Sequence, residues 1–268
     1  MAARTDTADS AGPSGQPNLV TRLRACLAMV VLLGAGYAGL WLVQLRMRWQ
    51  GASPDLATRA LQRWYRRWAW PWLRLRVHVD GTQPGGPCLY VANHRSYLDI
   101  PILSGVLGGT FLSRADVADL PLVGPVARAI DAVFLDRDDP RDRVRAARAL
   151  MRRARHASVI AFPEGTTTGE RLPGPFEPGL FRLLYRLETP VVPVTIRYSD
   201  RRAYWTDDAT VGVHLRTRVF AGPPLCVAVH IGTALRAAEY ADSEALAAAV
   251  HAAVCAPIER EGEIVGET

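Results

Sequence analysis

The residues best suited to acid–base chemistry lie in the segment VANHRSYLDIPIL, residues 91–103. A histidine takes a proton from a hydroxyl near neutral pH when an acceptor holds its other ring nitrogen, and a carboxylate is the strongest such acceptor. Asp99 is the nearest carboxylate to His94. Because positions five apart on a continuous helix point about 140° apart, the pair can meet only if His94 precedes the helix. The spacing therefore predicts a histidine–carboxylate pair. On these residues alone, a capping histidine and an ordinary first-turn carboxylate explain the pattern equally well.

Two further polar clusters also follow short apolar runs. Asp136-Arg137 comes after AVFL, and Pro163-Glu164-Gly165-Thr166 comes after SVIAF. Ligands of open α/β sheets sit beyond the carboxyl ends of the strands, so all three clusters could face one pocket.

Several catalytic motifs are missing from the sequence. It has no G-x-S-x-G elbow, no H-E-x-x-H metal helix and no glycine-rich phosphate loop ending in lysine. We therefore disfavour a covalent serine or a metal and expect no cofactor. Direct transfer remains, with a base activating an acceptor hydroxyl and arginines holding phosphate.

Apolar strands and helices alternate around these clusters, which predicts an α/β layer fold. The alternating residues 73–79 predict a half-exposed strand, and the wholly apolar CLYVA predicts a strand covered on both faces. Beyond residue 196 the pattern is less legible. We expect further strands over 110–113, 132–135, 158–162, 191–196 and 225–231, and helices over 97–107, 122–130, 140–156, 180–187 and 243–254.

The amino-terminal part has a different composition. Residues 1–20 lack periodicity and predict a disordered tail. Residues 25–45 carry no charge and are long enough to cross a bilayer core, either spanning it or re-entering the same leaflet. An amphipathic helix rich in arginine and tryptophan follows and suits the headgroup region. We therefore expect membrane-anchoring helices over 21–71 and a catalytic domain over 72–268.

Arginine supplies all of the positive side-chain charge of lysine and arginine type in this chain. The net charge is +6, with 32 Lys+Arg positions and no lysine. Such a balance suits nucleic acid, an anionic membrane or phosphorylated substrates. Because the arginines cluster beside membrane-type sequence and no nucleic-acid motif is present, we expect membrane lipids and no nucleic acid as partners. The four cysteines show no metal-ligand spacing, and we interpret them as buried thiols in a reducing compartment.

Four ordered blocks resemble the glycerolipid acyltransferase family, typified by bacterial 1-acylglycerol-3-phosphate acyltransferase. The blocks are Asn93-His94-x-x-x-x-Asp99, Val133 to Arg137, Phe162 to Thr166 and Val192 to Thr195. The segment from Phe111 to Arg114 also resembles that family's link between its first two blocks.

The resemblance implies a mixed sheet with flanking helices, preceded by a membrane-anchoring helical segment. It implies His94 as the base and Asp99 as its orienting partner. Arg137 would hold the anionic head of the acceptor, while Glu164 and Gly165 would shape the acceptor pocket. The remaining residues assigned to substrate binding on this basis are Arg114, Thr166 and Thr167. The donor would be acyl-CoA or an acylated acyl carrier protein, and the site would lie on the cytoplasmic side of the inner membrane.

The chain departs from the family pattern beside the third block. Many members carry arginine and serine where this chain has Thr167 and Thr168, and Arg171 could substitute for the lost guanidinium. The expected activity is acylation of 1-acyl-sn-glycerol-3-phosphate to phosphatidic acid. The Glu-Gly-Thr-Thr form also resembles enzymes that acylate lyso-ornithine lipids, which leaves an aminolipid acceptor as an alternative. A non-catalytic protein that binds anionic lipid is a third possibility.

Overall fold

The computed structural model describes residues 54–120, 123–136, 138–187, 189–206 and 208–266, together with Leu27 and Gly34. The predicted tail, the rest of the predicted membrane-crossing run and Arg137 lie outside the described residues, and the boundary at residue 72 stays a prediction. Within the described part, no helix combines the length and the apolar composition needed to cross a bilayer.

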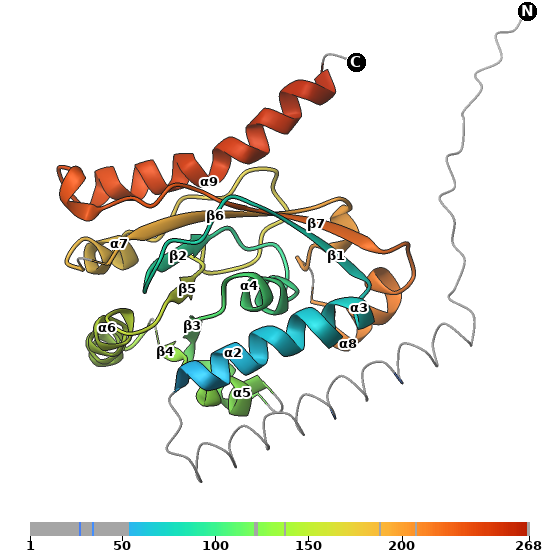
Figure 1. Ribbon diagram of the computed structural model, residues 1–268, viewed down its shortest axis with the longest axis horizontal. Helices are drawn as coiled ribbons and strands as arrows, with labels where there is room; N and C mark the ends of the chain where they lie inside the picture. Colours follow the sequence, from blue (N-terminus) through green and yellow to red (C-terminus); the bar gives the residue numbers. More distant parts are fainter. Residues whose placement is uncertain are drawn as a thin grey trace, which may run out of the picture.

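The described strands form one mixed sheet in the order β1-β7-β6-β2-β5-β3-β4 (Figure 1). Strands β6, β2, β5, β3 and β4 run parallel to one another, while β7 is antiparallel to β6 and β1 is parallel to β7. The predicted α/β fold with a mixed sheet is therefore confirmed. The strands are β1 (Leu75–Asp80), β2 (Leu89–Ala92), β3 (Thr110–Arg114), β4 (Val133–Leu135), β5 (Val159–Ala161), β6 (Val191–Tyr198) and β7 (Leu225–Ile231).

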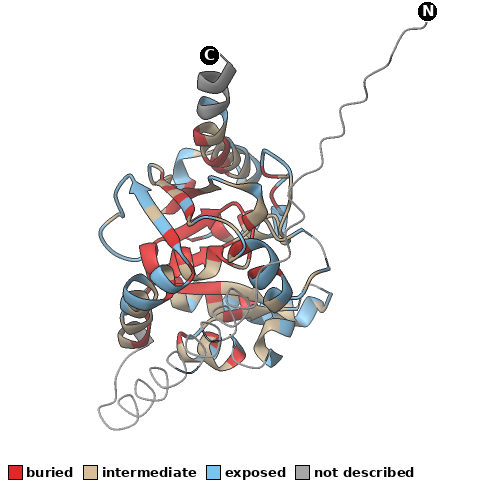
Figure 2. Cartoon of the chain, turned by 90° about the vertical axis from the view of Figure 1, so that its right-hand side faces the viewer, coloured by how far each residue is buried: buried red, intermediate tan, exposed pale blue. Residues whose placement is uncertain are grey.

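Helices cover both faces of the sheet, so that two apolar clusters sandwich it. One cluster packs α4 and the α2–α3 region against the sheet, and the other packs α6, α7 and α9. Figure 2 shows the buried residues concentrated in the central strands. The helical elements that cover the sheet or carry the residues discussed below are α2 (Pro54–Trp64), η1 (Tyr65–Ala69), α3 (Trp70–Trp72), α4 (Asp99–Leu107), α5 (Val123–Ala129), α6 (Pro140–Ala154), α7 (Pro178–Leu184), α8 (Val211–His214), η4 (Leu215–Val219) and α9 (Ser243–Gly266).

The α2–α3 region packs on the sheet domain through α4. Trp70 Nε1 donates to the carbonyl of Pro101 at 3.0 Å, and Gln62 Nε2 donates to the carbonyl of Val106 at 3.1 Å. Gly105 admits the indole, because a Cβ there would lie 2.4 Å from a Trp70 ring atom. The arginines of this amphipathic region remain on the outer side.

Two expectations need correction. Cys226 is exposed, whereas Cys88 and Cys255 are buried as predicted. Strand β7 alternates, and its buried positions Leu225 and Val227 place the intervening Cys226 on the other face. Helix α9 also runs past its expected end at residue 254, through Pro257, a residue that normally disfavours a helix interior.

Candidate active site

The histidine-bearing turn begins where β2 ends. All four residues of β2 are buried, and α4 starts at Asp99, so His94 lies in the intervening turn. Its ring Nδ1 lies 2.8 Å from Asp99 Oδ2. The adjacent Asn93 fixes the end of β2 to β6, because its amide group both donates to the carbonyl of Ile196 at 3.0 Å and accepts from its N–H at 2.8 Å.

The carboxylate of Asp99 is fully buried and accepts hydrogen bonds from several groups of the described chain. Its Oδ2 accepts from the backbone N–H groups of Arg95 at 2.7 Å and Ser96 at 3.0 Å, and its Oδ1 accepts from the Tyr198 hydroxyl at 2.5 Å. An ionised carboxylate satisfies such an arrangement, which places the proton of the neutral imidazole on Nδ1 of His94. Burial, together with the Asp99 charge, raises the pKa of Tyr198 well above its ordinary value, so its hydroxyl stays protonated as a donor.

The imidazole of His94 is held flat against Phe162, the residue that follows β5. The two ring centroids are 4.1 Å apart and the planes differ by 15°. Phe111 also stacks with Phe162, and the centroids of these two rings are 6.2 Å apart. The His94 side chain is 18 % exposed, and among the described residues no partner is seen for its Nε2. This nitrogen is therefore available to accept a proton.

The carboxylate of Glu164 is turned inward rather than toward solvent. Its side chain is 2 % exposed. Oε1 accepts from the backbone N–H of His94 at 2.8 Å, while Oε2 accepts from the N–H of Gly174 at 3.1 Å and from the Thr168 hydroxyl at 3.3 Å. Glu164 thus joins the histidine-bearing turn to the loop over 163–174.

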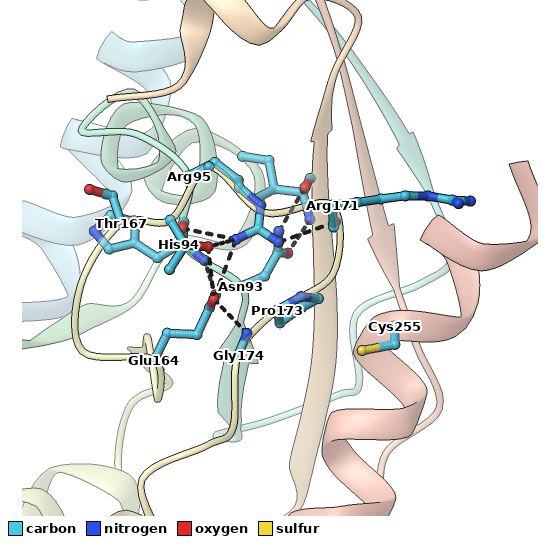
Figure 3. A network of polar contacts seen from close by, with 12 residues as sticks. Asn93, His94, Arg95, Glu164, Thr167, Arg171, Pro173, Gly174 and Cys255 are labelled. Atoms are coloured by element: carbon cyan, nitrogen blue, oxygen red, sulfur yellow. Dashed lines mark hydrogen bonds and ion pairs between the residues drawn. The ribbon is translucent and has the colours of Figure 1, made fainter. Parts of the chain in front are cut away.

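Arg95 completes this connection (Figure 3). Its side chain is 1 % exposed, and Nη1 lies 3.3 Å from Glu164 Oε2 and 2.5 Å from Thr168 Oγ1. Nη2 donates to the carbonyl of Arg171 at 3.4 Å, and the N–H of Trp205 donates to the Arg95 carbonyl at 2.9 Å. The guanidinium is therefore engaged inside the protein. Figure 3 shows the Arg171 side chain directed away from this network, toward α9.

The remaining residues of the third block lie in the loop that follows β5. Gly165 has a φ of +74° and donates to the Phe162 carbonyl at 3.1 Å, a tight turn that favours glycine. Thr166 is exposed. The Thr167 hydroxyl donates to the Trp205 carbonyl at 2.5 Å, so it holds the neighbouring loop.

Arg114, another predicted binding residue, lies at the same edge of the sheet but outside the His94 turn. Arg114 ends β3 and forms an exposed ion pair with Asp116 at 3.0 Å. Asp136 follows β4, where its N–H donates to Asp142 Oδ2 at 2.7 Å, and the next residue, Arg137, lies outside the described residues. In the described part of the chain, no group of three His, Cys, Asp or Glu side chains is placed to hold a metal.

Sequence reasoning missed the supporting residues Tyr198, Arg95 and Thr168. Tyr198 could have been found, since it ends β6 and the carboxyl ends of parallel neighbours β6 and β2 share one edge. Arg95 and Thr168 carried no comparable signal, because their pairing with Glu164 depends on how two loops fold together.

The comparisons with known proteins agree with this fold and with the resemblance carried by the sequence blocks. The family profile described as Acyltransferase matches residues 74–197. A lyso-ornithine lipid O-acyltransferase of Pseudomonas aeruginosa is 35% identical over 204 residues, covering 73% of this chain and 79% of that protein. The chain therefore belongs to the acyltransferase family, as its four sequence blocks predicted.

Two other relatives extend this result. A lyso-ornithine lipid O-acyltransferase of Rhodobacter capsulatus is 34% identical, covering 68% of this chain and 70% of that protein. A chloroplastic 1-acyl-sn-glycerol-3-phosphate acyltransferase of Brassica napus is 38% identical, but over 41% of this chain and 33% of that protein. The crystal structure of the 1-acyl-sn-glycerophosphate acyltransferase PlsC from Thermotoga maritima superposes with a TM-score of 0.70 at 24% identity, covering 91% of this chain and 96% of that one, which shows the shared fold.

Proposed function

We propose that this protein transfers a fatty acyl group from an acyl thioester to the free hydroxyl of a lysolipid at a membrane surface. The observation that carries the proposal is the His94–Asp99 pair, in which a buried carboxylate holds Nδ1 and leaves Nε2 open. The donor is acyl-CoA or an acylated acyl carrier protein, and the site faces the cytoplasmic side of the inner membrane.

The reaction proceeds by direct attack. Nε2 of His94 takes the proton of the acceptor hydroxyl, while the hydroxyl oxygen bonds to the thioester carbonyl carbon. The tetrahedral intermediate then collapses, the carbon–sulfur bond breaks, and the leaving thiolate receives the proton from His94. Asp99 keeps the imidazole in the productive tautomer and stabilises the imidazolium that forms.

We propose a lyso-ornithine lipid as the acceptor, because the residues around His94 offer little to a phosphate. The Arg95 guanidinium is buried and bonded to protein groups. Threonine stands at 167, its hydroxyl bonded to a backbone carbonyl, and Arg171 points away. The two lyso-ornithine lipid O-acyltransferases reported above also match over about 70% of their length or more, in contrast to the shorter match to the phosphate-acceptor enzyme.

A second candidate acceptor is 1-acyl-sn-glycerol-3-phosphate. Conversion of this lipid to phosphatidic acid is favoured by Asp136-Arg137 after β4, where Arg137 would hold the phosphate, and by the sequence blocks that resemble that enzyme class.

The two acceptors are distinguished by offering each, side by side, to detergent-purified protein with a labelled acyl-CoA and with labelled acyl carrier protein. The His94→Ala variant serves as the blank. We expect His94-dependent product from lyso-ornithine lipid and little from 1-acyl-sn-glycerol-3-phosphate. Product from the phosphate acceptor alone would assign the second candidate. Absence of product from either acceptor, with strong binding to anionic vesicles, would assign a non-catalytic lipid-binding role.

A further inference from the structure

Two helical regions display arginine together with large apolar side chains. In the region from α2 to α3, Arg66 and Arg67 are exposed, and Trp68 and Trp72 are 51% and 37% exposed. In α8–η4, the valines are 40% and 42% exposed and two arginines follow them. We call these residues together the basic apolar face: Arg66, Arg67, Trp68, Trp72, Val211, Val213, Arg216 and Arg218.

The two regions adjoin each other. Arg74, two residues after α3, donates from Nη1 to the carbonyl of Gly222 at 2.8 Å, just beyond η4. Its own carbonyl accepts from the N–H of Leu225 at 3.0 Å. Leu73 and Val219 are buried in the same apolar cluster, and Figure 1 places α3 beside α8. The two helical regions therefore form one continuous end of the molecule.

The composition of this end fits an anionic bilayer. Residues 56–79 and 209–225 contain arginines but no aspartate or glutamate. Guanidinium groups bind lipid phosphates, while tryptophan and valine side chains enter the boundary between headgroups and acyl chains. In water the apolar side chains of Val211 and Val213 stay exposed, whereas a bilayer would bury them.

We propose that the basic apolar face docks on an anionic phospholipid bilayer, with α8–η4 as a second docking element beside the α2–α3 region. Val211 and Val213 enter the lipid boundary, and Arg216 and Arg218 contact the phosphates.

The buried side of the same helix supports the catalytic turn. His214 is fully buried between the Tyr97 hydroxyl, 3.0 Å from Nδ1, and the Tyr204 carbonyl, 3.0 Å from Nε2. A carbonyl only accepts, so in the neutral ring Nε2 donates and Nδ1 accepts from Tyr97. Tyr97 lies three residues after His94. Given the proposed function, docking through α8 holds the catalytic turn at the surface that contains its lysolipid.

The test places an environment-sensitive fluorescent label at position 213 of the full-length chain. Val213→Cys is made in a background with Cys26→Ser and Cys226→Ser, and the buried Cys88 and Cys255 remain. Val144→Cys is the matched control, because Val144 is 52% exposed on the arginine-rich helix α6, which also carries Asp142 in its first turn. No substrate is present, so the result is independent of acyl transfer.

We expect the label at 213, but not at 144, to shift to the blue and to be quenched by lipid-borne quenchers in phosphatidylglycerol vesicles. Each cationic side chain near an anionic surface contributes about a factor of five to binding. Arg216→Glu with Arg218→Glu should therefore raise the lipid concentration for half-maximal shift more than about tenfold, whereas Arg143→Glu with Arg148→Glu should leave it unchanged.

Two results would overturn the proposal. One is a label at 213 that stays in water when the vesicles bind, above all if an acidic protein such as acyl carrier protein protects it instead. The other is equal insertion into phosphatidylcholine vesicles, which would remove the role assigned to the arginines.

Discussion

Arg95→Met should destabilise the protein far more than an ordinary loss of a surface charge. The substitution removes a guanidinium that is 1 % exposed and leaves the Glu164 carboxylate, 2 % exposed, without a cation. Removing one partner of a buried ion pair costs about 3–5 kcal/mol, since the remaining charge is buried and uncompensated. A domain is typically stable by about 5–15 kcal/mol, so the loss is a large share of the total.

The matched control is Arg114→Met. Its pair with Asp116 is shorter, at 3.0 Å, but the two side chains are 64 % and 63 % exposed. Exposed pairs contribute about 0–1 kcal/mol, so this change should be nearly neutral. Distance alone predicts the opposite ranking, and burial therefore decides the comparison.

The assay is urea unfolding followed by tryptophan fluorescence for the wild type, both single variants, Glu164→Gln and the double variant Arg95→Met with Glu164→Gln. Glutamine keeps an acceptor for the His94 N–H and removes the charge. We expect the double variant to recover at least about 2 kcal/mol relative to the sum of the single changes. The reasoning is refuted if Arg95→Met costs no more than Arg114→Met, or if the two changes at the buried pair are additive.

Three further outcomes follow from the structure. Tyr198→Phe should lower the free energy of unfolding by about 1.5–3 kcal/mol, because Oδ1 of buried Asp99 loses a donor. The raised pKa of Tyr198 in the folded state gives stability that is present below the ordinary value of 10.0 and is lost as pH rises through the folded pKa, so the variant should lose less stability at alkaline pH than the wild type. Urea unfolding at pH 8 to 11 measures both effects. Iodoacetamide at pH 8 should modify Cys226 at least about tenfold faster than the two buried cysteines, whose thiol pKa values are raised chiefly by burial. Peptide mass spectrometry measures the modification of each cysteine, and equal rates would contradict their difference in burial. Gly165→Ala should lower the free energy of unfolding by about 1–2 kcal/mol, because the residue has a φ of +74°. Gly179→Ala in α7, with open space around its Cβ position, should cause no such loss. Equal midpoints of unfolding for the two variants would contradict the predicted backbone strain.

Much of the fold could be predicted because β2, β4 and β5 are short apolar runs and helical periods separate the parallel strands. The wholly apolar run CLYVA contains β2, and the expected turn before α4 places His94 within reach of Asp99. The α8–η4 region was not predicted, because its alternating valines and arginines match neither a helical stripe nor a two-residue period over a useful length.

The finer roles within the site depend on long-range packing. The family resemblance assigns Glu164 to an acceptor pocket. The fold instead brings Arg95, 69 residues earlier in the chain, against Glu164 and buries both side chains. Cys226 could not be distinguished from a core cysteine, because its exposure depends on which face of β7 is covered.

The central claim is that His94, held by Asp99, is the base. Its most direct test is the single-turnover rate of thioester consumption by His94→Ala, with the lysolipid acceptor saturating and its affinity measured separately. We expect a rate lower by about 10² to 10⁴, with acceptor affinity and unfolding midpoint little changed. A rate within tenfold of wild type would contradict it, and would remove His94 from the chemistry.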